Sequence, residues 1–383
     1  MIAYNKTLLE NTFLVEEAID LRKSGFIQGE NLNAIKQQLT TLKTSRNIFV
    51  RAGSFLLGAL LYLSIIGLLF LIIFNLNSDF KMAGFIISFI GLGILELLCS
   101  QNFFRHGLDD AFIIGAQLSF YSAIVVDSNS PIGGFVAMII IGLVFAIRYV
   151  NTLSFLVFLT GIVFLVSYML IEHTEVSAIL PFVLLAIAIG FYYTYQKFKD
   201  HPKLYFYNDV LEWFFIYTLF LGYLSVNYFV VRSLSEELLS ANYTQSDVPF
   251  GWLFYILMFA FPLVYIFYSL KTKNRTMLYI GGLTFALSIL TFRYYHSVLP
   301  AEWALLLAGL GIFAFVYFVI QKIKTKETGI TFKHDHTNDT AMLNNIEALI
   351  VNSQDIKHAE EVEQSKMPFG GGGFSGGGAG GSF

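Results

Sequence analysis

An apolar block from Ser54 to Ile323 constrains this chain more than any other part of its sequence. Apolar runs follow one another through the block, with only short polar interruptions between them. The hydrocarbon core of a bilayer is about 30 Å thick, and roughly 20 apolar helical residues cross it. Backbone groups in hydrocarbon must be paired within their own segment, so each run should be a helix. The sequence therefore predicts an all-α fold, a polytopic transmembrane helical bundle of about ten spans.

The expected spans form ten consecutive runs. In chain order they are Phe55–Phe74, Met82–Cys99, Ala111–Val126, Ile132–Tyr149, Leu153–Ile171, Val176–Tyr195, Val210–Val231, Phe250–Leu270, Met277–Phe292 and Trp303–Ile323. The third and the ninth runs are the shortest and carry the most polar residues. Composition agrees with a membrane class, because only 13% of the 383 residues are charged, whereas a soluble domain carries about a quarter.

The basic residues predict how the chain is threaded. If the N-terminus is placed inside, the inner segments hold 21 of the 24 Lys and Arg residues, and the outer loops hold only Lys81, Arg232 and Arg293. Such an excess is typical of cytoplasmic loops. We therefore expect an integral membrane protein with both termini in the cytoplasm. The first 50 residues are polar and show no cleavable signal peptide, so the first run should act as an uncleaved anchor.

The segments outside the block are expected to be cytoplasmic. Residues 1–53 have apolar positions at three- and four-residue spacing, which predicts an amphipathic helical hairpin too small to stand alone. Residues 54–323 form the transmembrane domain, residues 324–367 a linker and an amphipathic helix, and residues 368–383 a disordered glycine-rich tail. Residues 1–53 and 339–365 are therefore the segments through which a protein partner could bind.

Polar side chains inside a membrane are functional candidates by default. Glu96 is interpreted either as a carboxylate that reaches the cytoplasmic interface or as one that binds a proton or cation inside the bundle. Gln117 lies deeper and either hydrogen-bonds a neighbouring helix or lines an interior. With Ser119, Tyr121 and Ser122 it makes the third run the most polar of the ten.

Charges gather at the predicted inner rim of the bundle. They are Arg105, Asp109, Asp110, Arg148, Asp209 and Glu212. Interfacial ion pairs are the simpler interpretation, and a vestibule that recruits cations is the alternative. We expect no metal site and no cofactor, because the histidines are scattered and a single cysteine, Cys99, rules out a thiolate zinc or iron–sulfur site. A net charge of −3 gives no basic field for nucleic acid.

Several catalytic signatures are missing from the sequence. We find no His-Glu-x-x-His, no Gly-x-Ser-x-Gly and no phosphate-binding Gly-x-x-x-x-Gly-Lys. The first hypothesis is therefore a non-enzymatic scaffold or sensor that engages partners through its cytoplasmic segments. The second is a secondary transporter or channel for a small solute or ion, and an intramembrane enzyme is a more distant third.

Two stretches resemble known families. The hairpin stretch Leu21–Leu32, followed by many spans, resembles bacterial membrane proteins of the domain of unknown function 2157 family. An early Gly-Gln pair of that family corresponds only loosely to Gly115-Ala116-Gln117, where alanine intervenes. The resemblance implies a bacterial inner-membrane protein and no particular activity. The tail Phe369–Phe383 is similar to the glycine-rich endings of TPM-domain membrane proteins, although it ends in Phe where Trp is commoner and no TPM domain is present.

Overall fold

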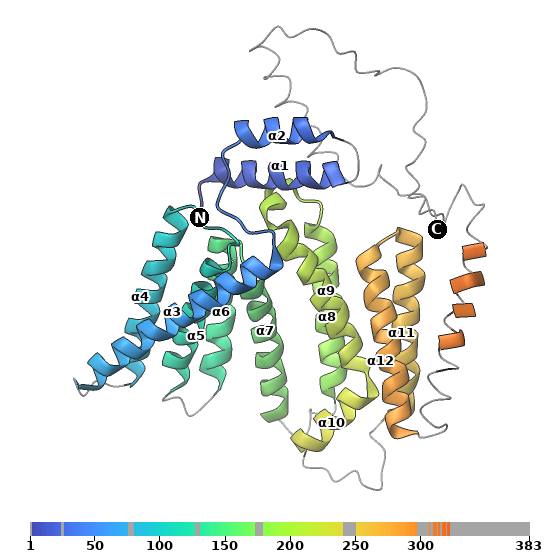
Figure 1. The fold of residues 1–383 in the computed structure, drawn as a ribbon. Helices are drawn as coiled ribbons and strands as arrows, with labels where there is room; N and C mark the ends of the chain where they lie inside the picture. The colour runs from blue at the N-terminus through green and yellow to red at the C-terminus, as the bar shows by residue number, and fades with distance from the viewer. Residues whose placement is uncertain are drawn as a thin grey trace, which may run out of the picture. The chain divides into compact units, whose positions relative to one another are not determined.

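The computed structural model describes residues 2–23, 27–75, 80–126, 131–172, 179–239 and 250–296, with separate residues between 306 and 321 (Figure 1). Within these ranges the chain is helical, and its one extended pairing is an isolated bridge between Lys43 and Phe103. The all-α prediction is confirmed for this part of the chain. Most of the tenth run, the linker and helix at 324–367 and the tail at 368–383 lie outside the described residues.

Eight helical segments of the described chain are long and apolar enough to cross a membrane. They belong to α3 (Ile48–Asn75), α4 (Phe80–Ser100), α5 (Leu108–Val125), α6 (Ile132–Tyr149), α7 (Thr152–Glu172), the 3₁₀ helix η2 (Pro202–Tyr207) continued by α9 (Asn208–Val226), α11 (Gly251–Thr272) and α12 (Arg275–Tyr295). Helix α8 (Leu180–Phe198) has 19 residues, and its last turns carry Gln196 and Lys197. Helix α10 (Tyr228–Leu239) is shorter.

In α3 and α12 a polar cap starts the helix before the apolar run that predicted it. Asn47 accepts a hydrogen bond from the Phe49 backbone N–H at 3.0 Å, which starts α3 at Ile48. Asn274 does the same for Met277 at 3.0 Å and starts α12 at Arg275, so the ninth span is not short. Hydropathy alone places a helix start at its first apolar residue, whereas the cap sets the true start.

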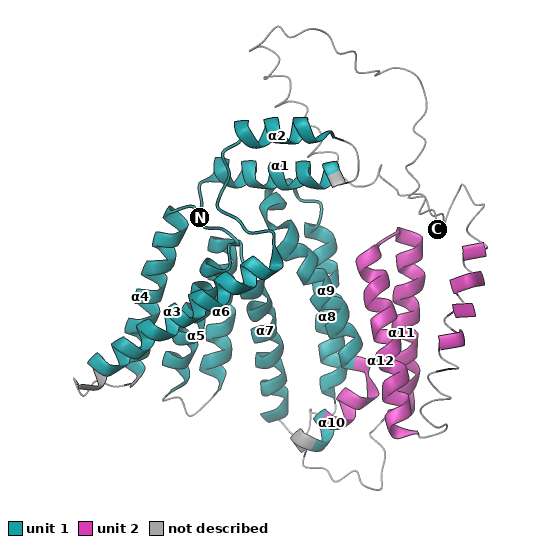
Figure 2. Cartoon of the chain, in the orientation of Figure 1, with its two compact units in different colours: residues 1–225, 234–244 teal, residues 226–233, 245–383 magenta. Residues whose placement is uncertain are grey.

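The chain divides into two compact units (Figure 2). Unit 1 comprises residues 1–225 and 234–244, and unit 2 comprises residues 226–233 and 245–383. In unit 1 the helices pack closely in the pairs α4–α5, α6–α7 and α3–α5. Glycine makes the α6–α7 approach possible, because a Cβ on Gly142 would lie 2.8 Å from the Phe158 backbone nitrogen.

In unit 2, α11 and α12 pack against each other. The Ser288 hydroxyl donates to the Met258 carbonyl across this pair at 2.7 Å. At one end of the pair, the ring of Tyr228 stacks on that of Tyr255 with 4.1 Å between their centroids. Hydroxyls that bond neighbouring helices in this way are typical of helix packing in membranes.

Helices α1 (Lys6–Lys23) and α2 (Gly29–Gln38) pack against one another at one end of unit 1 (Figure 1). The Ala3 backbone N–H donates to the Arg148 carbonyl at 2.8 Å, and the ring of Phe13 meets that of Phe104 edge-on. One buried apolar cluster runs from Leu9 on α1 into the bundle helices. The N-terminal segment therefore shares its core with the bundle.

Thr12 fastens the chain after α2 to α1, and its loss is expected to loosen that attachment. Its hydroxyl donates to the Leu8 carbonyl at 2.7 Å and accepts from the Leu42 backbone N–H at 2.9 Å. Thr12→Val keeps the shape but leaves a buried N–H unpaired, which should cost about 1–3 kcal/mol. Hydrogen exchange should show a faster Leu42 amide, whereas Thr7→Val, at an exposed position, should leave it unchanged.

Candidate functional site

A polar network joins α3, α5 and the turn between α6 and α7 in unit 1. The Arg51 guanidinium donates to Asp110 Oδ2 through Nε at 2.9 Å and through Nη2 at 2.6 Å. Asn151 Nδ2 donates to the other oxygen of the same carboxylate at 3.2 Å. Asp110 is only 6% exposed, so three donors compensate a carboxylate that is largely removed from water.

The network continues from Asn151 into the bundle. Asn151 Oδ1 caps α7 by accepting from the Ser154 backbone N–H at 2.9 Å and also accepts from the Ser154 hydroxyl at 3.1 Å. Gln117 Nε2 on α5 donates to the Ser154 hydroxyl oxygen, and Tyr121 Oη donates to Gln117 Oε1 at 3.2 Å. Gln117 is 3% exposed. Its amide therefore bonds α5 to α7 and is packed among neighbours.

The other polar residues of α5 are also paired. The hydroxyls of Ser119 and Tyr62 on α3 lie 2.8 Å apart, and Ser119 is buried. Ser122 donates to the Ser119 carbonyl of its own helix at 2.9 Å. Gln117 and Ser119 are therefore buried in helix–helix contacts, whereas Ser122 is exposed.

Glu96 forms an ion pair at the rim. Arg148 donates to it through Nε at 2.7 Å and through Nη2 at 2.8 Å, and the Tyr149 hydroxyl donates to the same carboxylate. The side chains of Glu96 and Arg148 are 33% and 41% exposed. Glu96 is therefore partly exposed and neutralised by Arg148, and both interpretations from sequence stay predictions.

The remaining rim charges have different surroundings. Arg105 is paired with Asp209 at the start of α9, and its guanidinium lies over the Phe104 ring at 4.9 Å. Asp109 accepts from the backbone N–H groups of His106 and Gly107, each at 3.0 Å. Glu212 lies on α9 and is exposed. Asp109 and Asp110 belong to the first turn of α5, where carboxylates suit the positive end of the helix dipole.

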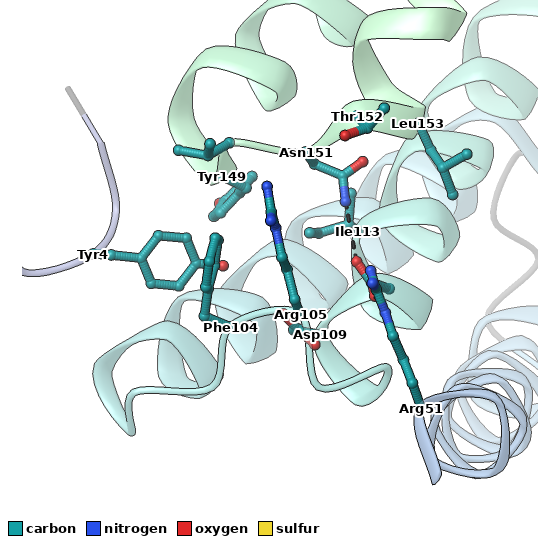
Figure 3. Close-up of a pocket in the computed structure, with 12 residues that line it drawn as sticks. Tyr4, Arg51, Phe104, Arg105, Asp109, Ile113, Tyr149, Asn151, Thr152 and Leu153 are labelled. Atoms are coloured by element: carbon teal, nitrogen blue, oxygen red, sulfur yellow. Dashed lines mark hydrogen bonds and ion pairs between the residues drawn. The ribbon is translucent and has the colours of Figure 1, made fainter. Parts of the chain in front are cut away.

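A cavity of about 50 Å³ lies among these groups (Figure 3). Its walls come from the N-terminal segment, α3, the loop before α5, α5 itself and the α6–α7 turn. The lining residues are Tyr4, Arg51, Phe104, Arg105, Asp109, Asp110, Ile113, Tyr149, Val150, Asn151, Thr152 and Leu153. It is far smaller than the several hundred Å³ of a typical pocket for an organic ligand.

Two polar atoms at the cavity have no hydrogen-bond partner among the described residues, namely Tyr4 Oη and Arg105 Nη2. Tyr4 is 5% exposed, and burial raises the pKa of its hydroxyl well above the usual value. The Cys99 thiol, a weak hydrogen-bonding group, interacts with this hydroxyl. The hydroxyl is therefore protonated and without an oxygen or nitrogen partner.

Glu16 on α1 also has a shifted pKa. Burial raises the pKa of this carboxyl, and the nearby positive charges of Arg105 and Arg46 oppose the rise. The folded state therefore binds this proton more tightly than the unfolded state does. The attachment of α1 should weaken as the pH rises through that raised pKa.

Several members of the network were not singled out from the sequence, chiefly Arg51, Tyr62, Asn151 and Ser154. Asn151 had a recognisable signal, because an Asn directly before an apolar run is typical of a helix N-cap. Arg51 and Tyr62 had none, since each pairs with a residue more than fifty positions away. In the described part of the chain, no three His, Cys, Asp or Glu residues are grouped so that they could hold a metal ion.

Comparison of the chain with protein-family models, with curated proteins and with solved structures gives no match. The resemblances drawn from the hairpin and the tail therefore remain predictions.

Gln117→Leu tests whether the α5–α7 bond is structural. The change keeps the approximate volume and leaves the Tyr121 hydroxyl without its partner, so we expect a loss of about 1–2 kcal/mol. Thermal unfolding of the detergent-purified protein measures it. Leu118→Ala serves as the control. Leu118 is the next residue of α5 and is 60% exposed, so its replacement should change stability far less. Equal effects at the two positions would contradict the assignment.

Proposed function

We propose that this protein is a non-enzymatic membrane scaffold or sensor that presents its N-terminal helices to a protein partner. The observation that carries the proposal is the packing at Gln117, the polar residue deepest in the polar span. Its amide is buried and bonded to α5 and α7 neighbours. A transporter needs a substrate site near the middle of its bundle, and here that position is occupied by helix–helix contacts.

The N-terminal helices provide the surface for a partner. α1 is buried along one face, whereas α2 buries only Leu32. The exposed residues of α2 are mostly polar, including Asn33, Lys36 and Gln37. Because α1 shares its core with the bundle, a partner bound on α2 would be held rigidly against the membrane domain. A scaffold needs to hold its partner in a fixed position, and a rigidly attached helix does this better than a domain on a flexible tether.

The threading we propose has ten spans and both termini in the cytoplasm of a bacterium, across its inner membrane. α7 and η2 both begin near the N-terminal segment, since Ala3 bonds Arg148 and Phe13 packs on Phe206. The chain must therefore return between them, and among the described residues α8 is the helix that lies between α7 and η2 in the sequence. With α8 counted, the eight apolar segments become nine spans. The tenth apolar run, Trp303–Ile323, would make ten, and an even number of spans leaves both termini on the same side of the membrane.

Site-specific photo-crosslinking in the native membrane tests the scaffold proposal. A crosslinker placed at Asn33 or Gln37 should trap one defined partner, and the trapped species should disappear when Lys36→Glu alters the same face. A crosslinker at the lipid-exposed Leu118 is the matched control and should not trap that partner. If both α2 positions trap nothing but lipid in cells, the scaffold proposal fails.

A channel or transporter for a small ion is the second candidate, and one observation favours it. Arg51, Asp110, Asn151, Ser154 and Gln117 form a continuous hydrogen-bonded chain from the rim into the bundle. Such a chain resembles the proton relays of membrane proteins. Proteoliposomes with a trapped pH dye separate the candidates. Proton flux that stops in Asp110→Asn would favour the channel, and an impermeable vesicle would favour the scaffold.

A further inference from the structure

The groups left unpaired at the cavity are hydrogen-bond donors. The Tyr4 hydroxyl and Arg105 Nη2 lack partners among the described residues, and the Tyr4 side chain points toward Phe104 and Arg105 (Figure 3). Thr152 and Leu153 also line the cavity. They are the first residues of α7, where backbone N–H groups have no partner within the helix. Donors therefore face the cavity from three directions.

The acceptors at the cavity are already engaged. Asp110 accepts from Arg51 on one oxygen and from Asn151 on the other. Asp109 accepts through Oδ1 from two backbone N–H groups of the loop before α5. Asp110, which is bonded on both oxygens, therefore has little remaining capacity for a cation.

The charges around the cavity come close to cancelling, so its unpaired donors decide which ligand it suits. The two arginines and two aspartates that line it cancel formally, and Asp209, the partner of Arg105, adds one negative charge. The starts of α5 and α7 offset that charge with the partial positive charge of two helix N-termini, each about half a unit. An unpaired guanidinium N–H adds a charged donor, and such donors make the stronger hydrogen bonds to anions.

The volume restricts the size of the ligand. A water needs roughly 10–15 Å³ of such space, so about 50 Å³ holds only a few water-sized particles. A monatomic anion with an accompanying water fits this space, whereas an organic acid does not.

We propose that this cavity is a binding site for a monatomic inorganic anion of the size of chloride, held by the Tyr4 hydroxyl, Arg105 Nη2 and the N-terminus of α7. The bound anion bridges the N-terminal segment to the bundle, because Tyr4 and Thr152 lie on these two parts. It therefore stabilises the attachment of α1. The site stands whether or not the α2 surface binds a protein partner.

Chloride titration of the purified full-length protein tests the site directly. The protein is titrated with sodium chloride against sodium gluconate at constant ionic strength. Binding is followed by the ³⁵Cl NMR linewidth and by the thermal unfolding midpoint. We expect a saturable broadening and a midpoint that rises with chloride, because a ligand that binds only the folded state stabilises it. If the wild-type protein gives the same linewidth and midpoint in both salts, the cavity holds water and the proposal is overturned.

Tyr4→Phe removes the hydroxyl and keeps the ring. A hydrogen bond to a charged acceptor contributes enough that its loss should weaken chloride binding roughly tenfold or more. Tyr205→Phe is the matched control and should titrate like wild type. The Tyr4 ring packs on Phe104 and the Tyr205 ring on Phe13, but Tyr205 does not line the cavity. If Tyr4→Phe does not fold, Arg105→Lys is tested in its place. This change keeps the positive charge and removes Nη2, and chloride binding should weaken by a similar factor. Wild-type chloride affinity in a folded variant of either kind would overturn the proposal.

Discussion

Asp110→Ala is expected to lower the free energy of unfolding by about 2–3 kcal/mol. Removing one partner of a buried ion pair costs roughly 3–5 kcal/mol, because the other charge is left uncompensated. Here the Arg51 side chain is 44% exposed and water replaces part of the lost interaction, which reduces the cost. The buried Asn151 amide loses its acceptor as well. Unfolding of the purified protein in mixed micelles with increasing denaturing detergent gives the measurement.

A second ion pair supplies the control for Asp110. Arg46 Nη2 and Asp20 Oδ1 lie 2.9 Å apart, so the contact is as close as those of Arg51. Their side chains are 38% and 54% exposed, and a pair of this kind contributes at most about 0.5–1 kcal/mol. Asp20→Ala should therefore be the milder change by a clear margin. If the two substitutions destabilise equally, burial of Asp110 is not what makes its pair strong.

The helices of this protein could be predicted because their signal is local. A run such as Ile132–Tyr149 is both the predicted span and the observed α6, since hydrophobicity over about twenty residues decides the outcome. Helix starts were predicted less well where a polar cap precedes the apolar run. Asn47 lies beyond the apolar residues that defined the first run, and it begins α3 several residues earlier.

The site could be predicted only as a set of residue types. Glu96 and Asp110 are recognisable from sequence as acidic residues at the ends of spans. Their partners are not, because Arg148 and Arg51 lie 52 and 59 positions away and meet them only through helix packing. The cavity is even harder to predict from the sequence, since one of its lining residues, Tyr4, lies outside the membrane block. A single sequence carries no information on such pairings.

Gly107→Ala is expected to be the most disruptive single change, with a loss of about 2–6 kcal/mol. Gly107 has φ +105°, a conformation that side chains rarely adopt, and strain of this kind costs roughly 1–3 kcal/mol. An added Cβ would also lie 2.2 Å from the Arg51 carbonyl oxygen. Backbone cannot yield as a flexible side chain does, so relieving the overlap should cost about 1–3 kcal/mol more. The start of α3 would have to move, and Arg51 with it, away from Asp110.

Gly67→Ala in the interior of α3 separates this effect from a general effect of glycine replacement. A Cβ at Gly67 meets nothing within 4 Å, and alanine is the better helix former by about 1 kcal/mol. This control should be neutral or slightly stabilising in the same detergent titration. In Gly107→Ala, exchange of the Asp109 and Asp110 amides should also accelerate, because the loop that caps α5 is displaced. A Gly107→Ala protein as stable as Gly67→Ala would show that the loop can re-form without glycine, and the tight contact between Gly107 and α3 would then not be what positions Arg51.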